Sequence, residues 1–282
     1  MITERIDLYE YFGLSRPAGA AGYLNVYVHF QSPEYCTGRL RPAMVVFPGG
    51  GYEMLSDREK EPIALAFMVN GFNAFTVEYS LRPLTYPTQL IEGVMAVLYV
   101  KLNAEKYNLD IDKVAGIGFS AGGHLLGTVA NMYDHEDVCK VLGERCKLAK
   151  LNGCVYSYPV VSSGENAHVG SIMNLTAGDS EKIAKVSVDK NITKNSSPAF
   201  IWTTADDACV PAENSFMLAS AYKKLGLPFE LHVFQSGIHG LSLSTKETCS
   251  KEGNGFLTND SDAKWLDLAV TFLKNNGFEI KQ

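Results

Sequence analysis

The sequence lacks the features that would assign it to a membrane or to the secretory route. Its longest apolar stretches, 63–77 and 94–100, are too short or too interrupted by Asn and Gly to span a bilayer. The first 14 residues carry three acidic side chains and no apolar core of a signal peptide. From these two absences we expect a soluble, cytoplasmic protein without a membrane partner.

Cysteine motifs and clustered positive charge are also missing. The six cysteines show no C-x-x-C spacing, which predicts reduced thiols and argues against a zinc site or a disulfide framework. With a net charge of −6 and no basic stripe interleaved with aromatics, a nucleic-acid partner is not expected. The composition is typical of a globular protein, and we interpret residues 1–282 as one domain whose 11 % aromatic content is compatible with a homodimer.

Short apolar or alternating runs, bounded by Gly, Pro or Asn, predict a series of strands. They are expected at 23–30, 43–47, 74–79, 114–119, 153–158, 199–204 and 229–234. Between most of them, apolar residues spaced three and four apart predict helices. The helices are expected at 57–69, 87–106, 121–133, 213–225 and 262–275.

Strands that alternate with helices pair in parallel through right-handed crossovers, which predicts an α/β fold. We therefore expect a mostly parallel twisted sheet with helices on both faces. The strand at 23–30 alternates more clearly and precedes any expected helix, so it is interpreted as an antiparallel edge. The polar stretch at 160–197 is longer than a plain connection and is interpreted as a small lid-like insertion over the active site.

The stretch "GIGFSAGGHL" at 116–125 places Ser120 between Gly118 and Gly122, at the point where an expected strand meets an expected helix. This context is typical of a nucleophile elbow, in which a strained turn exposes the serine Oγ and any flanking Cβ would collide with main chain. The amide of Ala121, at the helix N-terminus, would then face the group under attack. The alternative is a serine that only caps the helix.

A serine nucleophile needs a base and an acid that orients the base. Asp206 and Asp207 follow the strand expected at 199–204, and His239 follows the next strand in a glycine-bounded loop. Carboxyl ends of strands are where open α/β sheets place their chemistry. We favour Asp207 over Asp206, which could instead accept from loop amides, although the residues by themselves barely separate the two.

The other histidines are interpreted as structural. His232 lies inside an alternating strand, and His124, in the helix after Ser120, is typical of a packing or hydrogen-bonding residue. His29, His135 and His168 miss the strand-end pattern. Separately, "VVFPGGGY" at 45–52 ends an early strand in three glycines whose open amides could serve an oxyanion or could form a flexible turn.

Four segments together resemble the α/β-hydrolase superfamily. They are "FPGGGY", "GFSAGGHL", "ADDACVPAENS" and "GIHGLSL", and the resemblance runs over about 25–273. Within the superfamily, the chain is similar to the carboxylesterase and carbohydrate acetylesterase-like (acetyl xylan esterase-like) branch near the hormone-sensitive lipase group. Pro48 stands where that branch usually has the histidine of its HGGG loop.

The resemblance implies an α/β-hydrolase fold and a role for each matched residue. Ser120 would be the nucleophile and His239 the base, and the D-x-x-V-P form of the acid segment assigns Asp207 as the acid. The amides of Gly50, Gly51 and Ala121 would form the oxyanion hole, with no metal or cofactor.

The function expected on these grounds is a serine hydrolase that cleaves short-chain esters, acetyl esters above all, of sugars or small alcohols through an acyl-enzyme. Its partner is then a small-molecule ester. One alternative is a serine peptidase or amide hydrolase, which usually carries an additional gating domain. A second alternative, from another class, is a non-catalytic binding protein on a hydrolase scaffold, which would typically have lost a member of the triad.

Overall fold

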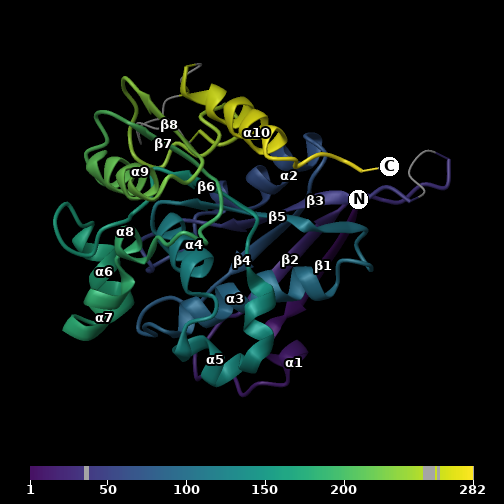
Figure 1. Ribbon diagram of the computed structural model, residues 1–282, viewed down its shortest axis with the longest axis horizontal. Helices are drawn as coiled ribbons and strands as arrows, with labels where there is room; N and C mark the ends of the chain where they lie inside the picture. The colour runs from purple at the N-terminus through teal and green to yellow at the C-terminus, as the bar shows by residue number, and fades with distance from the viewer. Residues whose placement is uncertain (35–37, 250–257, 259–260, 282) are drawn as a thin grey trace.

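The computed structural model describes residues 1–34, 38–249, 258 and 261–281, and within them one eight-stranded sheet runs through the molecule (Figure 1). The strand order is β1-β2-β4-β3-β5-β6-β7-β8. The strands are β1 (Ile2–Asp7), β2 (Tyr23–Val28), β3 (Arg41–Phe47), β4 (Asn73–Glu78), β5 (Leu109–Phe119), β6 (Gly153–Ser157), β7 (Ala199–Thr204) and β8 (Phe229–Phe234).

Six of these strands, from β4 to β8 in the sheet order, pair in parallel, which confirms the predicted α/β class. β2 is antiparallel to both of its neighbours, β1 and β4, as its alternation indicated. The prediction that β2 is the edge is wrong, because β1 pairs outside it, with Ile2 opposite Val28. The charged residues Glu4 and Arg5 obscure the pattern of β1, and an edge strand tolerates such charges.

Helices cover both faces of the sheet (Figure 1). One face carries α2 and α10, and the other carries α1, α3, α4, α5 and α9. Their bounds are α1 (Leu8–Phe12), α2 (Glu61–Val69), α3 (Thr88–Leu102), α4 (Ala121–Met132), α5 (Glu136–Leu142), α9 (Glu213–Leu225) and α10 (Trp265–Asn275). All five predicted helices are present, α9 with the predicted bounds and the other four with shifted ends, whereas α1 and α5 are too short to show a period in the sequence.

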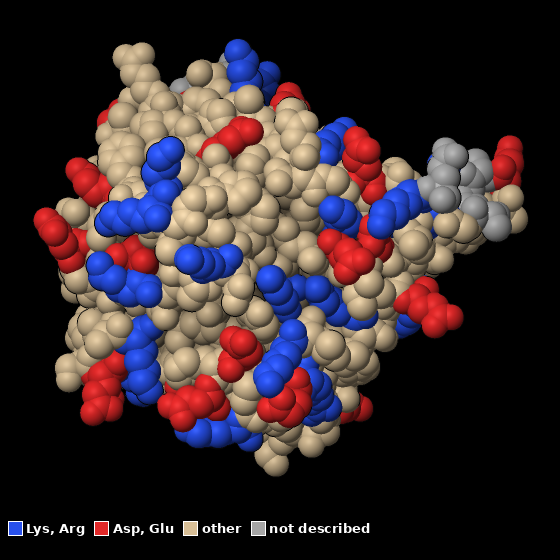
Figure 2. Space-filling view, viewed as in Figure 1, with Lys and Arg blue, Asp and Glu red and all other residues tan. Residues whose placement is uncertain are grey.

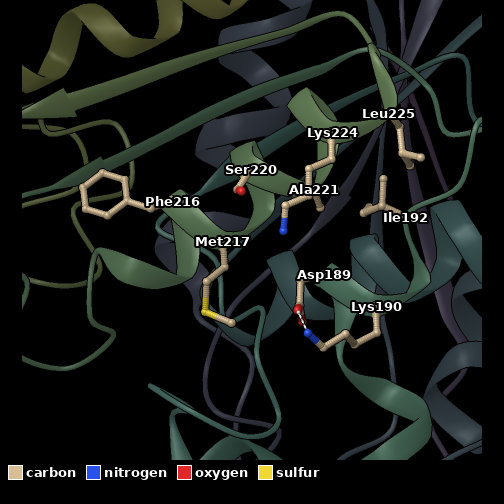
Figure 3. Close-up of a pocket in the computed structure, with 9 residues that line it drawn as sticks. All are labelled: Asp189, Lys190, Ile192, Phe216, Met217, Ser220, Ala221, Lys224 and Leu225. Atoms are coloured by element: carbon tan, nitrogen blue, oxygen red, sulfur yellow. Dashed lines mark ion pairs between the residues drawn. The ribbon is translucent and has the colours of Figure 1, made fainter.

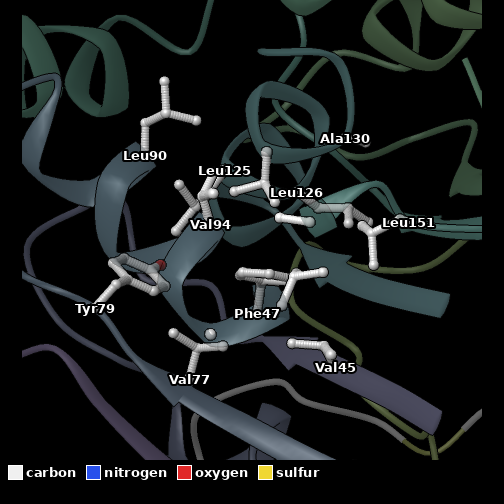
Figure 4. Close-up of a cluster of buried hydrophobic side chains, with 14 of the residues drawn as sticks. Val45, Phe47, Val77, Tyr79, Leu90, Val94, Leu125, Leu126, Ala130 and Leu151 are labelled. Atoms are coloured by element: carbon white, nitrogen blue, oxygen red, sulfur yellow. The ribbon is translucent and has the colours of Figure 1, made fainter. Parts of the chain in front are cut away.

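The core consists of two large apolar layers, one on each face of the sheet. Along β3, Val45 and Phe47 belong to the layer under α3 and α4, and Met44 and Val46 belong to the opposite layer under α2 and α10. Figure 4 shows part of the first layer, to which Phe47 of β3 and Val94 of α3 both belong. Burial on both faces explains why β3 reads as a continuous apolar run.

The segment 160–197, for which the sequence predicted no helix, contains three short helices. It forms α6 (Val169–Thr176), α7 (Ser180–Val186) and α8 (Val188–Asn191), seen at the left of Figure 1. Each helix contributes only one or a few buried apolar side chains, such as Ile172, Leu175 and Val188. Helices of four to eight residues with so few apolar positions give no readable period in the sequence.

Charged side chains of one sign do not gather on the visible face, and the described cysteines are not joined to one another. On the face shown in Figure 2, Lys and Arg side chains are interspersed with Asp and Glu. The five described cysteines form no disulfide, and Cys36 lies outside the described residues. Across the described part of the chain, no helix has both the length and the apolarity needed to cross a bilayer.

Two leucines on α3 test the assignment of its buried face. Leu98 is fully buried in the core, and Leu102, one turn later, is 48 % exposed. Leu98→Ala should lower the free energy of unfolding by about 2–5 kcal/mol, because it leaves a cavity, and Leu102→Ala by less than about 0.5 kcal/mol. Urea denaturation of both variants measures the difference, and equal losses would contradict this orientation of α3.

Candidate active site

Ser120 occupies a strained turn between β5 and α4. Its φ of 51° and ψ of −121° are unfavourable for a residue with a Cβ. A Cβ on Gly118 would lie 2.4 Å from the carbonyl oxygen of Gly122, and one on Gly122 would lie 2.2 Å from that of Phe47. The predicted collision of flanking side chains with main chain is therefore confirmed. The alternative, a helix-capping serine, is wrong because the Ser120 side chain makes no capping hydrogen bond.

The structure brings together the three side chains that the sequence singled out. His239 follows β8, and its Nε2 lies 2.7 Å from Ser120 Oγ. Its Nδ1 lies 2.7 Å from Asp207 Oδ2, with Asp207 following β7. Because an ionised carboxylate only accepts hydrogen bonds, the ring proton is on Nδ1. Nε2 is then free to accept from the serine hydroxyl, which is the arrangement of a nucleophile, a base and an orienting acid.

The two adjacent aspartates point in different directions. Asp207 uses Oδ2 for His239, and its Oδ1 accepts from the amides of Cys209 and Val210, both at 2.9 Å. Asp206 instead accepts from the amide of Gly237 at 2.7 Å. The structure thus distinguishes the two carboxylates, which the residues alone barely did. Asp207 is the one that contacts the imidazole, at the nitrogen that does not face Ser120.

The loop after β3 lines the same cavity as Ser120, through Gly50 and Gly51. Among the described residues, the amides of Gly50, Gly51 and Ala121 have no protein acceptor. Gly50 has a φ of 127°, and a Cβ there would lie 2.2 Å from the carbonyl oxygen of Met54. Unpaired amides of this kind are the donors that an oxyanion hole requires.

Side chains anchor this glycine loop, although Pro48 replaces the usual histidine. The hydroxyl of Tyr79 donates to the Pro48 carbonyl at 2.6 Å, and the carboxylate of Glu59 accepts from the Gly49 amide at 2.8 Å. Asn174 of α6 donates to the Gly51 carbonyl at 2.8 Å. Sequence reasoning missed all three anchors, because none belongs to a recognisable motif and their separations from the loop residues they bind range from 10 to 123 positions.

The cavity at this site has a volume of about 560 Å³. Its wall combines the glycine loop, the turn before α2, the triad serine, the triad histidine with the glycine that follows it, and two residues from other segments. The lining residues are Gly50, Gly51, Met54, Ser56, Asp57, Arg58, Glu59, Ser120, His168, Cys209, His239 and Gly240.

A second hollow of about 640 Å³ lies between α8 and α9 (Figure 3). It contains an ion pair between Asp189 and Lys190 at 2.9 Å, and Phe216 and Met217 form part of its apolar wall. The described residues that line it include Ser220 but no histidine to act as its base. Cavity size alone therefore does not locate the chemistry in this molecule.

The family profile of BD-FAE matches residues 29–222, more than half of the chain. The chain belongs to the BD-FAE family. The matched region contains Ser120 and Asp207 and ends before His239. The geometry described above therefore supplies the part of the site that the profile does not reach.

Two curated relatives match part of this BD-FAE chain. Endo-1,4-beta-xylanase B of Butyrivibrio fibrisolvens is 36 % identical over 222 residues, 76 % of this chain and 35 % of the relative. Acetylxylan esterase of Xylanibacter ruminicola is 30 % identical over 224 residues, 76 % of this chain and 43 % of the relative. The chain thus spans less than half the length of either protein.

Solved structures match nearly the whole chain. The acetyl ester-xyloside bifunctional hydrolase from Caldicellulosiruptor lactoaceticus has a TM-score of 0.82 at 30 % identity, with 98 % of this chain and 97 % of that one covered. The carboxylesterase Cest-2923 from Lactobacillus plantarum WCFS1 has a TM-score of 0.83 at 26 % identity, with 100 % of both chains covered. These matches confirm the α/β-hydrolase fold.

His168 lines the catalytic cavity, although the sequence analysis interpreted it as a structural residue. Its Nδ1 accepts from the amide of Ser171 at 3.3 Å, so the ring proton of the neutral imidazole is on Nε2. Nε2 lies 3.5 Å from the Cys209 sulfur in the cavity wall. Burial lowers the pKa of His168, and the nearby His239 lowers it further. The segment 160–197 thus presents a neutral N–H donor at the cavity.

His124 of α4 is confirmed as a buried hydrogen-bonding residue. Its Nε2–H donates to the Val186 carbonyl at 2.8 Å, and its Nδ1 accepts from the Tyr52 hydroxyl at 2.8 Å. Burial lowers the pKa of His124 to about 4. The ring therefore links the elbow helix both to the insertion and to the residue that follows the glycine loop.

The low pKa of His124 predicts a loss of stability in acid. The unfolded chain takes up a proton near pH 6.5 that the folded chain excludes down to about pH 4. This contribution to the free energy of unfolding is complete above pH 6.5 and falls by about 1.4 kcal/mol per pH unit below it. Between pH 7 and 5, wild type should lose about 2 kcal/mol more than His124→Gln in urea denaturation. An equal pH dependence of the two proteins would contradict the buried neutral ring.

Proposed function

We propose that the chain is a carboxylic ester hydrolase that uses Ser120 as its nucleophile and removes short acyl groups, acetyl above all, from sugars or other small hydroxylated compounds. The observation that carries the proposal is the pair of 2.7 Å hydrogen bonds joining Ser120, His239 and Asp207 beside unpaired amides. Relatives named as acetylxylan esterase, carboxylesterase and acetyl ester-xyloside hydrolase support the reaction class.

The first half of the reaction forms the acyl-enzyme. Ser120 Oγ attacks the ester carbonyl carbon while its proton passes to His239 Nε2. Negative charge develops on the carbonyl oxygen, where the amides of Gly50, Gly51 and Ala121 donate to it. Asp207 stabilises the imidazolium, which then gives its proton to the leaving alcohol oxygen as the ester C–O bond breaks.

The second half uses the same groups in reverse. A water molecule attacks the acyl carbon and loses its proton to His239 Nε2, and the same amides hold the oxyanion. The tetrahedral intermediate collapses, the bond from the acyl carbon to Ser120 Oγ breaks, and Oγ recovers the proton from His239. The products are a carboxylic acid and the free enzyme, and no step requires a further reactant.

The walls of the cavity support a polar leaving group. Asp57, Arg58 and His168 bring charged or hydrogen-bonding side chains to its lining, and Met54 adds an apolar surface. His168 Nε2–H is suited to donate to a hydroxyl oxygen. A volume of about 560 Å³ accommodates a small acyl group together with a sugar unit.

Substitutions of the triad test the mechanism. Ser120→Ala should lower kcat/KM on p-nitrophenyl acetate by at least about 1000-fold, and Asp207→Asn should also lower it by orders of magnitude, because the imidazole loses its orienting acceptor. Asp206→Asn is the matched control, since its side-chain carbonyl still accepts from Gly237, and it should stay within about threefold of wild type. Turnover retained by Ser120→Ala, or equal losses at positions 206 and 207, would contradict this mechanism.

The acyl and leaving-group preference needs a separate panel of substrates. On p-nitrophenyl esters, kcat/KM should fall from acetate through butyrate to octanoate, and acetylated xylose should be deacetylated. Faster hydrolysis of the octanoate would overturn the short-acyl assignment. Comparable cleavage of a p-nitroanilide would favour an amide hydrolase, and the absence of all turnover and of fluorophosphonate labelling at Ser120 would favour a binding protein.

A further inference from the structure

Glu59 is a buried carboxylate in the wall of the catalytic cavity, and the proposed mechanism gives it no step. It is 3 % exposed and ends the short 3-10 turn Asp57–Glu59. Each of its oxygens accepts one hydrogen bond. Oε2 accepts from the amide of Gly49 at 2.8 Å, and Oε1 accepts from the hydroxyl of Tyr158 at 2.7 Å.

Tyr158 extends this connection to the histidine loop. Its hydroxyl oxygen accepts from the amide of Ser242 at 2.9 Å, so its own hydrogen is directed to Glu59. Its ring meets the imidazole of His239 edge to face, with centroids 5.1 Å apart. One carboxylate therefore holds the glycine loop on one side and, through Tyr158, the loop that carries the base on the other.

The neighbouring Arg58 strengthens the same junction. Its guanidinium donates to the Gly240 carbonyl at 2.8 Å, and its own carbonyl accepts from the Ser242 hydroxyl at 2.6 Å. The backbone on both sides of the Gly240–Ser242 turn is thus held against residues 58 and 59. This turn directly follows His239, so the contacts of residues 58 and 59 end one to three residues from the imidazole.

The carboxylate also lies beside the nucleophile. A Cβ built on Gly49 would be 2.7 Å from Glu59 Oε2 and 3.1 Å from Ser120 Cβ. The first glycine of the loop therefore leaves the space in which the carboxylate approaches both the amide of residue 49 and the elbow. The next two amides along the chain are the proposed oxyanion donors.

We propose that Glu59 is a positioning residue that sets the spacing between the oxyanion amides and His239 by accepting simultaneously from Gly49 and Tyr158. The proposal rests on the proposed function and deepens it, because preorganised donors stabilise an oxyanion only when their distance to the reacting carbonyl is fixed beforehand. Glu59 acts through these neighbours and touches neither substrate nor reacting atoms.

The ionised carboxylate is the form that meets both donors. A protonated carboxyl would aim a hydrogen at either the Gly49 amide or the Tyr158 hydroxyl, and each of these groups already donates. Burial raises the pKa of Glu59 above its ordinary value, and the hydrogen bonds from Tyr158 and Gly49 and the charges of His239 and Arg58 offset only part of that rise. A glutamine at position 59 has the shape of the glutamate side chain, but one of the two accepting oxygens is replaced by an amide nitrogen. Glu59→Gln therefore tests the double acceptor role with little change in packing.

The experiment compares Glu59→Gln with Glu92→Gln. Glu92 is also fully buried, accepts from a backbone amide (Ser80, 2.6 Å) and a tyrosine hydroxyl (Tyr9, 2.9 Å), and is not among the described residues that line the cavity. On p-nitrophenyl acetate, Glu59→Gln should lower kcat about 10- to 100-fold with KM within about threefold of wild type. Glu92→Gln should leave kcat per folded enzyme within about twofold of wild type, even if its melting temperature falls as much as that of Glu59→Gln.

Tyr158→Phe keeps the test decisive if Glu59→Gln does not fold. It removes the Tyr158 hydroxyl from the connection and leaves the bond from Gly49 to Glu59, so it should lower kcat by less than Glu59→Gln does, again with KM unchanged. Where both fold, the double variant should lose less than the product of the single losses, because the two residues share one hydrogen bond.

Two patterns separate failure of this proposal from failure of the function. Three results would overturn the positioning role: equal kcat for Glu59→Gln and Glu92→Gln, an effect of Glu59→Gln on KM alone, or a Tyr158→Phe variant with wild-type kcat. The proposed esterase function would still stand if the wild type hydrolyses the ester and Ser120→Ala does not. A wild-type protein without ester hydrolysis, or a fully active Ser120→Ala, would overturn both.

Discussion

The site depends on the close approach of the first turn of α4 to the end of β3. No side chain separates them, since a Cβ on Gly122 would lie 2.2 Å from the Phe47 carbonyl oxygen. This main-chain contact sets the elbow beside the loop that begins at Pro48. The nucleophile, the helix N-terminus and the glycine amides are then neighbours before any triad contact is made. Asp207 and His239 reach this point from the carboxyl ends of β7 and β8, on the other side of β6 in the sheet, and complete the site.

Buried polar side chains hold the loops in place around this contact. Loops have no ladder of backbone hydrogen bonds, so their buried polar groups must find partners elsewhere. Tyr79, Glu59 and Asn174 supply partners for three successive parts of the glycine loop. His124 does the same for the end of α7. Burial of such groups is unfavourable by itself, and satisfied hydrogen bonds offset that cost at each of these positions.

The segment 160–197 contributes to the site in two physically different ways. Asn174 anchors the glycine loop from α6, and His168 faces the cavity from the residue that caps the same helix. Asn174 lies in this short helix and His168 caps it, so one helix joins the loop that would hold the oxyanion to the wall that would meet the leaving group. The triad itself lies entirely on segments that follow β5, β7 and β8.

The sequence by itself determined the parts that local chemistry specifies. Continuous apolar runs identify the buried strands, and glycines on both sides of Ser120 identify the elbow, because only glycine fits between closely packed main chains. His239 stands out because it follows a strand in a glycine-bounded turn. The edge strand β1, the different directions of the Asp206 and Asp207 side chains, and the positions of His168 and Glu59 were decided only by the tertiary structure. Glu59 and Tyr158 are 99 residues apart, and adjacent carboxylates diverge according to how their loop folds. Contacts between distant segments leave no local pattern to read.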